Sequence, residues 1–303
     1  MLRKPFEFRF TSTDGLQIAC SRWDSRGGDH GCGAGRGVVQ IAHGMGEHIG
    51  RYAGVIEALV SAGFRVYGND HRGHGRTAPS AAHFGDFGTG GFELLVEDMF
   101  RLSSIAREEN RNQPFILLGH SMGSFAAQRY VLDHSREIDG LALSGSGTLD
   151  ELALMAESAP PGTNILNSPF EPARTPFDWL SRDPAVADEF MHDPLCFADL
   201  QPRSALSFLA AAPRLADPLS LRTIRPDLPT YLFSGSKDPV GRQLQGVEAL
   251  IERYRKAGLH DMSKDFYPGG RHEMLHETNR AEVQERLLGW ISGVVERDKR
   301  KRA

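Results

Sequence analysis

The sequence has few of the features that mark disulfide-rich, membrane-spanning or nucleic-acid-binding proteins. Its 303 residues include three cysteines, Cys20, Cys32 and Cys196, which are too few and too far apart for a disulfide framework or a structural zinc site. No apolar run approaches the roughly 18–20 residues that span a bilayer, and the N-terminus lacks the apolar stretch of a signal peptide. A net charge of −4 gives no electrostatic reason to expect nucleic acid as a partner. We therefore expect a cytoplasmic globular protein.

Short apolar runs alternate with helical patterns along most of the chain. Two runs near the N-terminus are joined by Asp14-Gly15, a hairpin turn signal, and six later runs are apolar enough to be strands buried on both faces. Strands and helices in alternation predict an α/β fold, with a mostly parallel sheet of about eight strands and helices on both faces. The predicted strands are Phe6–Ser12, Leu16–Asp24, Val38–Ala42, Arg65–Asn69, Phe115–Leu118, Gly140–Leu143, Thr230–Phe233 and Lys264–Tyr267.

Residues 149–222 interrupt this alternation. They hold 10 of the 17 prolines but one of the 33 glycines, and their 11 acidic residues against five arginines and no lysine give a net charge of −6. Apolar residues are plentiful there, yet no run resembles a strand. The segment is predicted to be an inserted helical cap on a core made of residues 1–148 and 223–303, with ordinary connecting helices as the alternative.

Two further segments have unusual compositions. Residues 25–37 contain six glycines without the spacing of a phosphate-binding loop, so they are predicted to form a surface loop. The basic run Arg297–Arg302 is predicted to be a solvated, frayed end, with transient contact to an anionic membrane surface as the alternative.

The segment Gly119-His120-Ser121-Met122-Gly123 carries the strongest chemical signal. It follows a predicted buried strand and precedes a helical pattern, the context in which G-x-S-x-G places a serine on a sharp turn above the sheet edge. Glycines flank the serine because a side chain there would collide with the neighbouring strand or helix. Ser121 is therefore predicted to be a catalytic nucleophile.

A serine nucleophile needs a base, and the base needs an acid that orients it. In this architecture the acid and then the histidine follow the serine along the chain. Asp238 comes directly after the seventh predicted strand and His272 directly after the eighth, so both lie in loops at the carboxyl end of the sheet. We predict that Ser121, Asp238 and His272 form a catalytic triad.

Two backbone N–H groups are predicted to stabilise the oxyanion. One is that of Met122, at the start of the helix after the nucleophile, and the other is that of Met45, in the loop after the third strand. Gly44 and Gly46 would let this loop approach the substrate closely. His43 is expected to shape the loop through hydrogen bonds to the backbone.

A zinc peptidase is the competing hypothesis at the same residues, because His272 to His276 reads H-E-x-x-H. That chemistry requires both histidines on one face of a helix. Pro268-Gly269-Gly270 just before them predicts a loop instead. His71 and His74 could also suggest a metal pair, but no neighbouring ligands complete a set, so no metal or organic cofactor is expected.

With these motifs the chain resembles α/β-hydrolases of the monoacylglycerol lipase and lysophospholipase-like group. The similarity runs through His43–His48 with Gly50-Arg51-Tyr52, Asp70–Gly75, Gly119–Gly123 and Gly235–Val240. It implies the α/β-hydrolase fold, the same triad and oxyanion donors, and a cap over an acyl channel. It also implies that Glu47 and Arg51 lie near the alcohol end of the substrate, where either could instead brace the oxyanion loop through a salt bridge.

The leading hypothesis is hydrolysis of a carboxylic ester through an acyl-enzyme. A cap rich in Phe and Leu suggests a medium or long acyl chain, and its negative charge favours monoacylglycerols or zwitterionic lysophospholipids over anionic lipids. The small-molecule partner is thus a lipid-derived ester. A small-ester esterase, thioesterase or amidase on the same triad is the first alternative. A non-catalytic binding protein on a hydrolase scaffold is the second.

Overall fold

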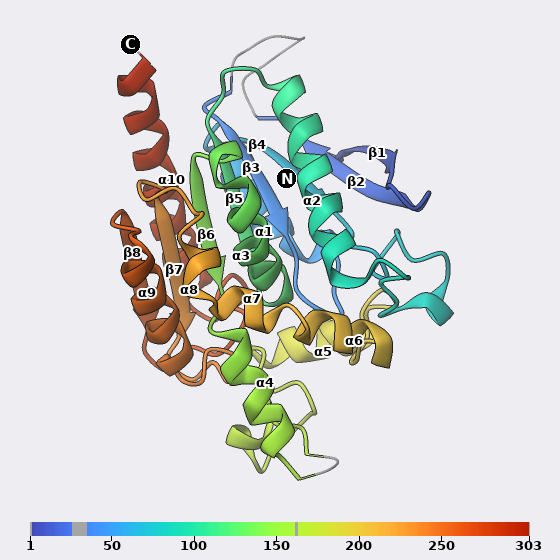
Figure 1. Cartoon of the computed structure of the whole chain (residues 1–303). Helices are drawn as coiled ribbons and strands as arrows, with labels where there is room; N and C mark the ends of the chain where they lie inside the picture. The colour runs from blue at the N-terminus through green and yellow to red at the C-terminus, as the bar shows by residue number, and fades with distance from the viewer. Residues whose placement is uncertain (1, 26–34, 161–162, 303) are drawn as a thin grey trace.

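The computed structural model describes residues 2–25, 35–160 and 163–302, and its centre is an eight-stranded sheet (Figure 1). The spatial order is β1-β2-β4-β3-β5-β6-β7-β8. β2 runs antiparallel to β1 and β4, while the strands from β4 to β8 pair in parallel. The prediction of a mostly parallel sheet of about eight strands is confirmed. The strands are β1 (Phe6–Thr11), β2 (Gln17–Trp23), β3 (Val38–Ala42), β4 (Arg65–Asn69), β5 (Phe115–His120), β6 (Gly140–Ser144), β7 (Thr230–Gly235) and β8 (Met262–Tyr267).

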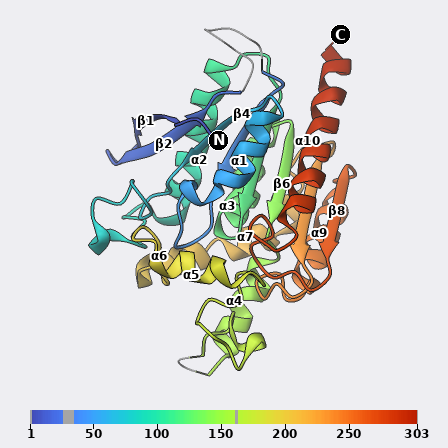
Figure 2. The same ribbon diagram turned by 180° about the vertical axis from the view of Figure 1, so that it is seen from behind.

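Helices cover both faces of the sheet, because every residue of β3, β5, β6 and β7 is buried and needs apolar cover on each side. α2 (Gly91–Glu109), α3 (Met122–His134) and α9 (Gln245–Ala257) pack on one face. α1 (Ala53–Ser61) and α10 (Arg280–Arg302) pack on the other, as the view from behind shows (Figure 2). Short 3₁₀ helices lie at Ile49–Tyr52, Ala81–His83, Ser135–Glu137 and Ser168–Phe170.

Between β6 and β7 the chain forms helices, and the described residues of this segment contain no strand. These helices are α4 (Leu149–Ser158), α5 (Pro184–His192), α6 (Pro202–Leu209), α7 (Ala212–Ala216) and α8 (Pro218–Leu221). Each helix from α5 to α8 has proline in its first turn, where the missing N–H has no intrahelical partner to lose. These helix starts account for four of the ten prolines of residues 149–222. α4, α5 and α6 lie across the end of the sheet to which the strand arrows point (Figure 1).

Two sequence predictions concern the remaining segments. Residues 26–34, which include Cys32 and most of the glycine-rich segment 25–37, lie outside the described residues. The basic run Arg297–Arg302 is helical, because α10 continues through Arg302 as an extension of the helix that packs on the sheet, and that its end is solvated and frayed stays a prediction. Over the described parts of the chain, no helix combines the length and the apolar character that a membrane crossing requires.

Candidate active site

Ser121 lies on the sharp turn between β5 and α3 that its motif predicts. Its backbone has a positive φ of 52°, with ψ −123°, which is uncommon for a residue other than glycine. A Cβ on Gly119 would lie 2.5 Å from the Gly123 carbonyl oxygen, and one on Gly123 would lie 2.2 Å from that of Ala42. Only glycine fits at either position, so the turn depends on both.

Asp238 and His272 are brought together from the loops after β7 and β8. His272 Nδ1 donates a hydrogen bond of 2.9 Å to Asp238 Oδ1, and both side chains are buried. The carboxylate is itself oriented by the Val240 N–H at 2.9 Å and by the Ser234 hydroxyl at 3.2 Å. This contact fixes the histidine tautomer that leaves Nε2 as the acceptor.

The environment of His272 suits a general base. Burial opposes a charge on the ring, but the Asp238 carboxylate outweighs it and raises the pKa of His272 above its ordinary value. Nε2 is buried and has no hydrogen-bond partner in the described part of the chain. The rings of His120 and Trp179 lie 4.7 and 4.8 Å from that of His272 and hold it from two sides. Burial lowers the pKa of His120 to about 4, so this neighbour stays neutral.

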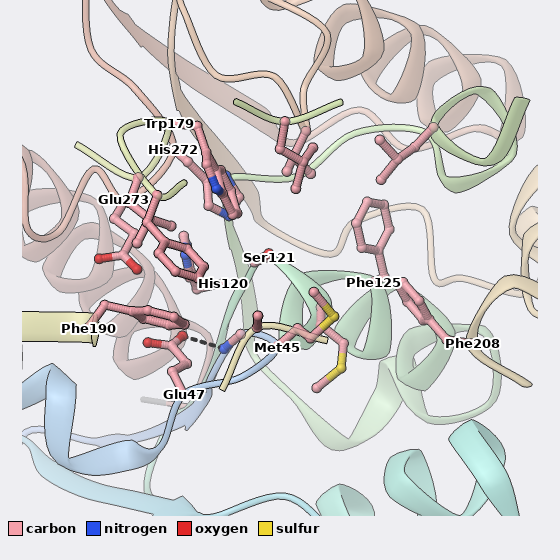
Figure 3. Close-up of a pocket in the computed structure, with 18 residues that line it drawn as sticks. Met45, Glu47, His120, Ser121, Phe125, Trp179, Phe190, Phe208, His272 and Glu273 are labelled. Atoms are coloured by element: carbon pink, nitrogen blue, oxygen red, sulfur yellow. Dashed lines mark hydrogen bonds between the residues drawn. The ribbon is translucent and has the colours of Figure 1, made fainter. Parts of the chain in front are cut away.

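Ser121 and His272 line a cavity with a free volume of about 640 Å³, counted with its open mouth (Figure 3). Glu47, Glu273 and His120 lie on one side of Ser121, whereas Phe125 and Phe208 lie on the other (Figure 3). The end of the cavity beside Glu47 thus holds the charged groups together with the ring of Phe190, the opposite end is apolar, and the serine lies between them. Further apolar lining comes from Leu152, Leu166, Phe177, Leu180 and Val240.

Both predicted oxyanion donors belong to the lining of this cavity. Met122 is the first residue of α3, so its N–H is one of those that a helix start leaves without an intrahelical partner. Met45 lies in the loop after β3, next to Gly44, where a Cβ would come within 3.1 Å of Ser121 Cβ. His43 shapes this loop as expected, since its Nε2 accepts a 2.9 Å hydrogen bond from the His71 N–H.

Glu47 and Arg51 lie together, but they face different surroundings. Glu47 lines the cavity and accepts hydrogen bonds from the Gly44 N–H at 2.5 Å and the Tyr52 hydroxyl at 2.6 Å. Arg51 lies behind it, with Nη1 2.8 Å from Glu47 and both Nη atoms 2.7 and 2.9 Å from the Glu273 carboxylate. Arg51 thus connects the oxyanion loop with the loop that carries His272.

Burial and the neighbouring charge of Arg51 have opposite effects on the pKa values of the Glu47 and Glu273 carboxyl groups. Burial alone would raise the pKa of Glu47 and of Glu273, but the Arg51 guanidinium outweighs it and holds both below their ordinary values. Burial would likewise lower the pKa of Arg51, and the two carboxylates instead raise it well above its usual range. The cluster is therefore an ionised network at neutral pH.

The zinc hypothesis at His272 to His276 is wrong, because this segment is a series of turns and the two histidines have different partners. His272 contacts Asp238, while His276 contacts Glu273 at 3.0 Å and the Arg51 carbonyl at 2.8 Å.

Among the described residues, His48, Asp193 and Cys196 form another group that could hold a metal ion. Each has one possible ligand atom, and these three atoms lie within 4.8 Å of one another. There His48 and Asp193 already share a 2.9 Å hydrogen bond, which ties the oxyanion loop to the chain after α5.

Sequence reasoning did not assign roles to three residues of the cavity. The sequence identifies Glu273 only as part of the zinc motif, although its adjacency to His272 is a signal that it belongs to the site. His120 occupies the variable position of G-x-S-x-G, so the motif gives no reason to select it. Trp179 lies in segment 149–222 and reaches His272 through tertiary contacts that leave no local pattern.

The comparisons with known proteins agree with this geometry. Residues 33–279 match the family model described as "Serine aminopeptidase, S33". The monoacylglycerol lipase of Mycolicibacterium smegmatis is 30% identical over 265 residues, which cover 84% of this chain and 88% of that protein.

Solved structures show the same relationship. A highly thermostable carboxyl esterase from Bacillus coagulans, in complex with glycerol, superposes with a TM-score of 0.85 at 30% identity, over 97% of this chain and 99% of that one. A lipase in an open form superposes with a TM-score of 0.82 at 30% identity, over 96% of this chain and 99% of that one. The chain therefore belongs to the serine aminopeptidase S33 family of α/β-hydrolases, and it is a monoacylglycerol lipase-like serine ester hydrolase.

Proposed function

We propose that the chain hydrolyses monoacylglycerols with a medium or long acyl chain, through an acyl-enzyme on Ser121. The observation that carries this proposal is the position of Ser121 between the charged groups at one end of the cavity and the apolar end opposite. A monoacylglycerol has the same division, with a diol head on one side of its ester and a hydrocarbon chain on the other. The relative from Mycolicibacterium smegmatis is named for this activity.

The triad residues have the following roles in this mechanism. His272 Nε2 takes the proton of the Ser121 hydroxyl as the oxygen attacks the ester carbonyl, and Asp238 stabilises the imidazolium that forms. The N–H groups of Met45 and Met122 donate to the oxyanion, each contributing roughly 3–4 kcal/mol to the lowering of the barrier. His272 then gives the proton to the departing glycerol oxygen. A water molecule, deprotonated by His272, releases the fatty acid and restores Ser121.

The end of the cavity beside Glu47 favours a neutral alcohol. Glu47 and Glu273 present acceptor oxygens to hydroxyl groups, and the carboxyl esterase from Bacillus coagulans is described as a complex with glycerol. A phosphate at this end would face two carboxylates whose countercharge, Arg51, is already paired with both. We therefore propose monoacylglycerol over lysophospholipid, with Glu47 near the alcohol and Arg51 as the brace of the oxyanion loop.

Residues 149–222 are proposed to act as the cap over the acyl chain, since Leu152, Phe177, Leu180 and Phe208 from this segment line the cavity. Contact of the basic C-terminal run with a membrane surface stays a prediction, as does the cytoplasmic location.

The test is turnover of monoacylglycerol by purified protein, compared with lysophosphatidylcholine, a p-nitrophenyl ester and an aminoacyl p-nitroanilide. We expect chelator-resistant release of fatty acid from monoacylglycerol, labelling of Ser121 by a fluorophosphonate, and loss of both in Ser121→Ala with an unchanged circular dichroism spectrum. Ser158→Ala, at an exposed serine of α4, is the matched control. Retained hydrolysis in Ser121→Ala would refute the nucleophile, and preference for the anilide would assign the amidase alternative.

A further inference from the structure

α6 is fixed directly on the core of the protein, although it belongs to segment 149–222. Ser204 Oγ accepts a 2.8 Å hydrogen bond from the Phe87 N–H, and Ser207 Oγ accepts a 3.1 Å bond from the Phe92 N–H. Phe87 lies just before α2, and Phe92 belongs to the first turn of that helix. These bonds pair backbone groups at buried or half-buried positions, so a movement of α6 away from the core would leave them unsatisfied.

Close backbone approaches strengthen this attachment. Gly91 has φ +60°, and a Cβ there would lie 2.8 Å from Ser207 Cβ. Gly85 has φ +73°, with a Cβ position 2.9 Å from the Gln201 nitrogen, and its carbonyl accepts a 3.1 Å hydrogen bond from the Gln201 N–H. The core contributes glycine at both points of contact, and α6 can therefore lie against it without a gap.

Phe208, near the end of α6, closes the apolar end of the cavity. Its ring packs edge-to-face against those of Phe92 and Phe125, with centroids 5.0 and 5.8 Å away, and both neighbours are fully buried. Phe125 and Phe208 lie farther along the cavity from Ser121, on the side opposite Glu47 (Figure 3). The apolar end is thus closed by an aromatic wall that is fixed to the core.

α4 also lies at the apolar end of the cavity, and its attachment to the core differs from that of α6. α4, which contributes Leu152 to the lining, is held by the buried Leu149 in its first turn and by ion pairs of Asp150 with Arg253 and of Glu151 with Arg242. The ion-paired side chains are 24–32% exposed, and ion pairs near water contribute little to stability. A long acyl chain would therefore meet its fixed limit at Phe208.

We propose that Phe208 is a specificity-determining residue whose ring sets the longest acyl chain that the cavity accepts. This rests on the proposed function, because it assigns the apolar end to the acyl group. Replacing the ring by a methyl group opens space that additional methylenes can fill. Each extra methylene buried there raises kcat/KM by about fourfold, the factor expected from its transfer out of water.

The experiment is a p-nitrophenyl ester series from butyrate to stearate, followed by saturated monoacylglycerols of the same lengths. In Phe208→Ala we expect the maximum of kcat/KM to move to longer chains. Phe208→Trp should move the maximum to shorter chains. Leu206→Ala is the matched control, because Leu206 lies on the same helix and is 70% exposed, and it should leave the profile unchanged.

Each result has a distinct meaning. An unmoved maximum in Phe208→Ala, in a protein that hydrolyses esters through Ser121, overturns this inference and leaves the proposed function standing. Absence of Ser121-dependent ester hydrolysis in the wild type overturns the proposed function itself. If Phe208→Ala does not fold, Phe208→Leu and Phe208→Trp decide the question, since opposite shifts support the wall and identical profiles refute it.

Discussion

Arg51 offers the sharpest test of the electrostatic reasoning, because one guanidinium compensates two buried carboxylates. Glu47 and Glu273 are each no more than 3% exposed, and Arg51 contacts both at 2.7–2.9 Å. The substitution Arg51→Met keeps most of the aliphatic length of the side chain and removes its charge. It leaves Glu47 without a cationic partner, while Glu273 keeps His276 at 3.0 Å.

The expected loss of stability at pH 7 is about 3–5 kcal/mol, the usual cost of removing one partner from a buried ion pair. That is a large share of the roughly 5–15 kcal/mol by which domains are stable. In the wild type Arg51 holds the pKa values of Glu47 and Glu273 below their ordinary range. The stabilisation by these ion pairs is therefore present at neutral pH and is lost as the pH falls through the two lowered pKa values. In Arg51→Met burial raises the pKa of Glu47, and the variant gains stability as the pH falls toward 4.

The assay is urea unfolding followed by circular dichroism at pH 7 and at pH 5. The difference between wild type and Arg51→Met should be larger at pH 7 than at pH 5. Arg174→Met is the control, because Arg174 pairs with Asp188 while 48% and 45% of their side chains are exposed. That exposed pair should contribute less than about 1 kcal/mol. A loss under about 1 kcal/mol in Arg51→Met at pH 7 would refute the reasoning.

Two further predictions concern His272. Because Asp238 raises the pKa of His272 against the effect of burial, kcat/KM should rise with pH through a value above the ordinary histidine pKa of about 6.5. Asp238→Asn should move this rise of kcat/KM to lower pH and reduce kcat by about 10⁴-fold. A rise at an unchanged pH would contradict the assignment of Asp238 as the partner of His272. Gly145→Ala would place a Cβ 2.8 Å from Cε1 of His272 and 2.9 Å from that of His120, so steady-state kinetics should show kcat reduced by about 10²-fold. Gly258 also has a positive φ, +109° against +55° for Gly145, but a Cβ there would meet nothing within 4 Å, so equal kcat losses in Gly145→Ala and Gly258→Ala would rule out the collision as the cause.

The sheet and the triad could be predicted because their signals are local. Strands buried on both faces appear as continuous apolar runs, and Val38–Ala42 and Arg65–Asn69 have the same bounds in the structure as in the prediction. Asp238 and His272 could be selected without knowing any contact, since each directly follows a strand and parallel strands end at one edge of the sheet. The triad itself remains a prediction that the geometry supports.

The residues that surround the triad could not be predicted, because their contacts join distant parts of the chain. Arg51 meets Glu273 across 222 positions, and nothing near either residue marks the other as its partner. The resemblance leaves open whether Arg51 lies near the substrate or braces the oxyanion loop through a salt bridge, and the structure has its guanidinium between two carboxylates.

The composition of segment 149–222 predicts its helices but not which of them is fixed to the core. Its prolines and the lack of strand-like runs predicted helices, and proline does stand in the first turn of α5 to α8. Composition could not show which of these helices is fixed, because that depends on whether a particular serine meets a particular backbone N–H. Ser204 and Ser207 lie 117 and 115 positions from the residues whose N–H groups they accept. The candidate nucleophile could be identified from motifs because its turn is local, whereas the proposed role of α6 in the choice of acyl chain could be inferred only from the folded structure.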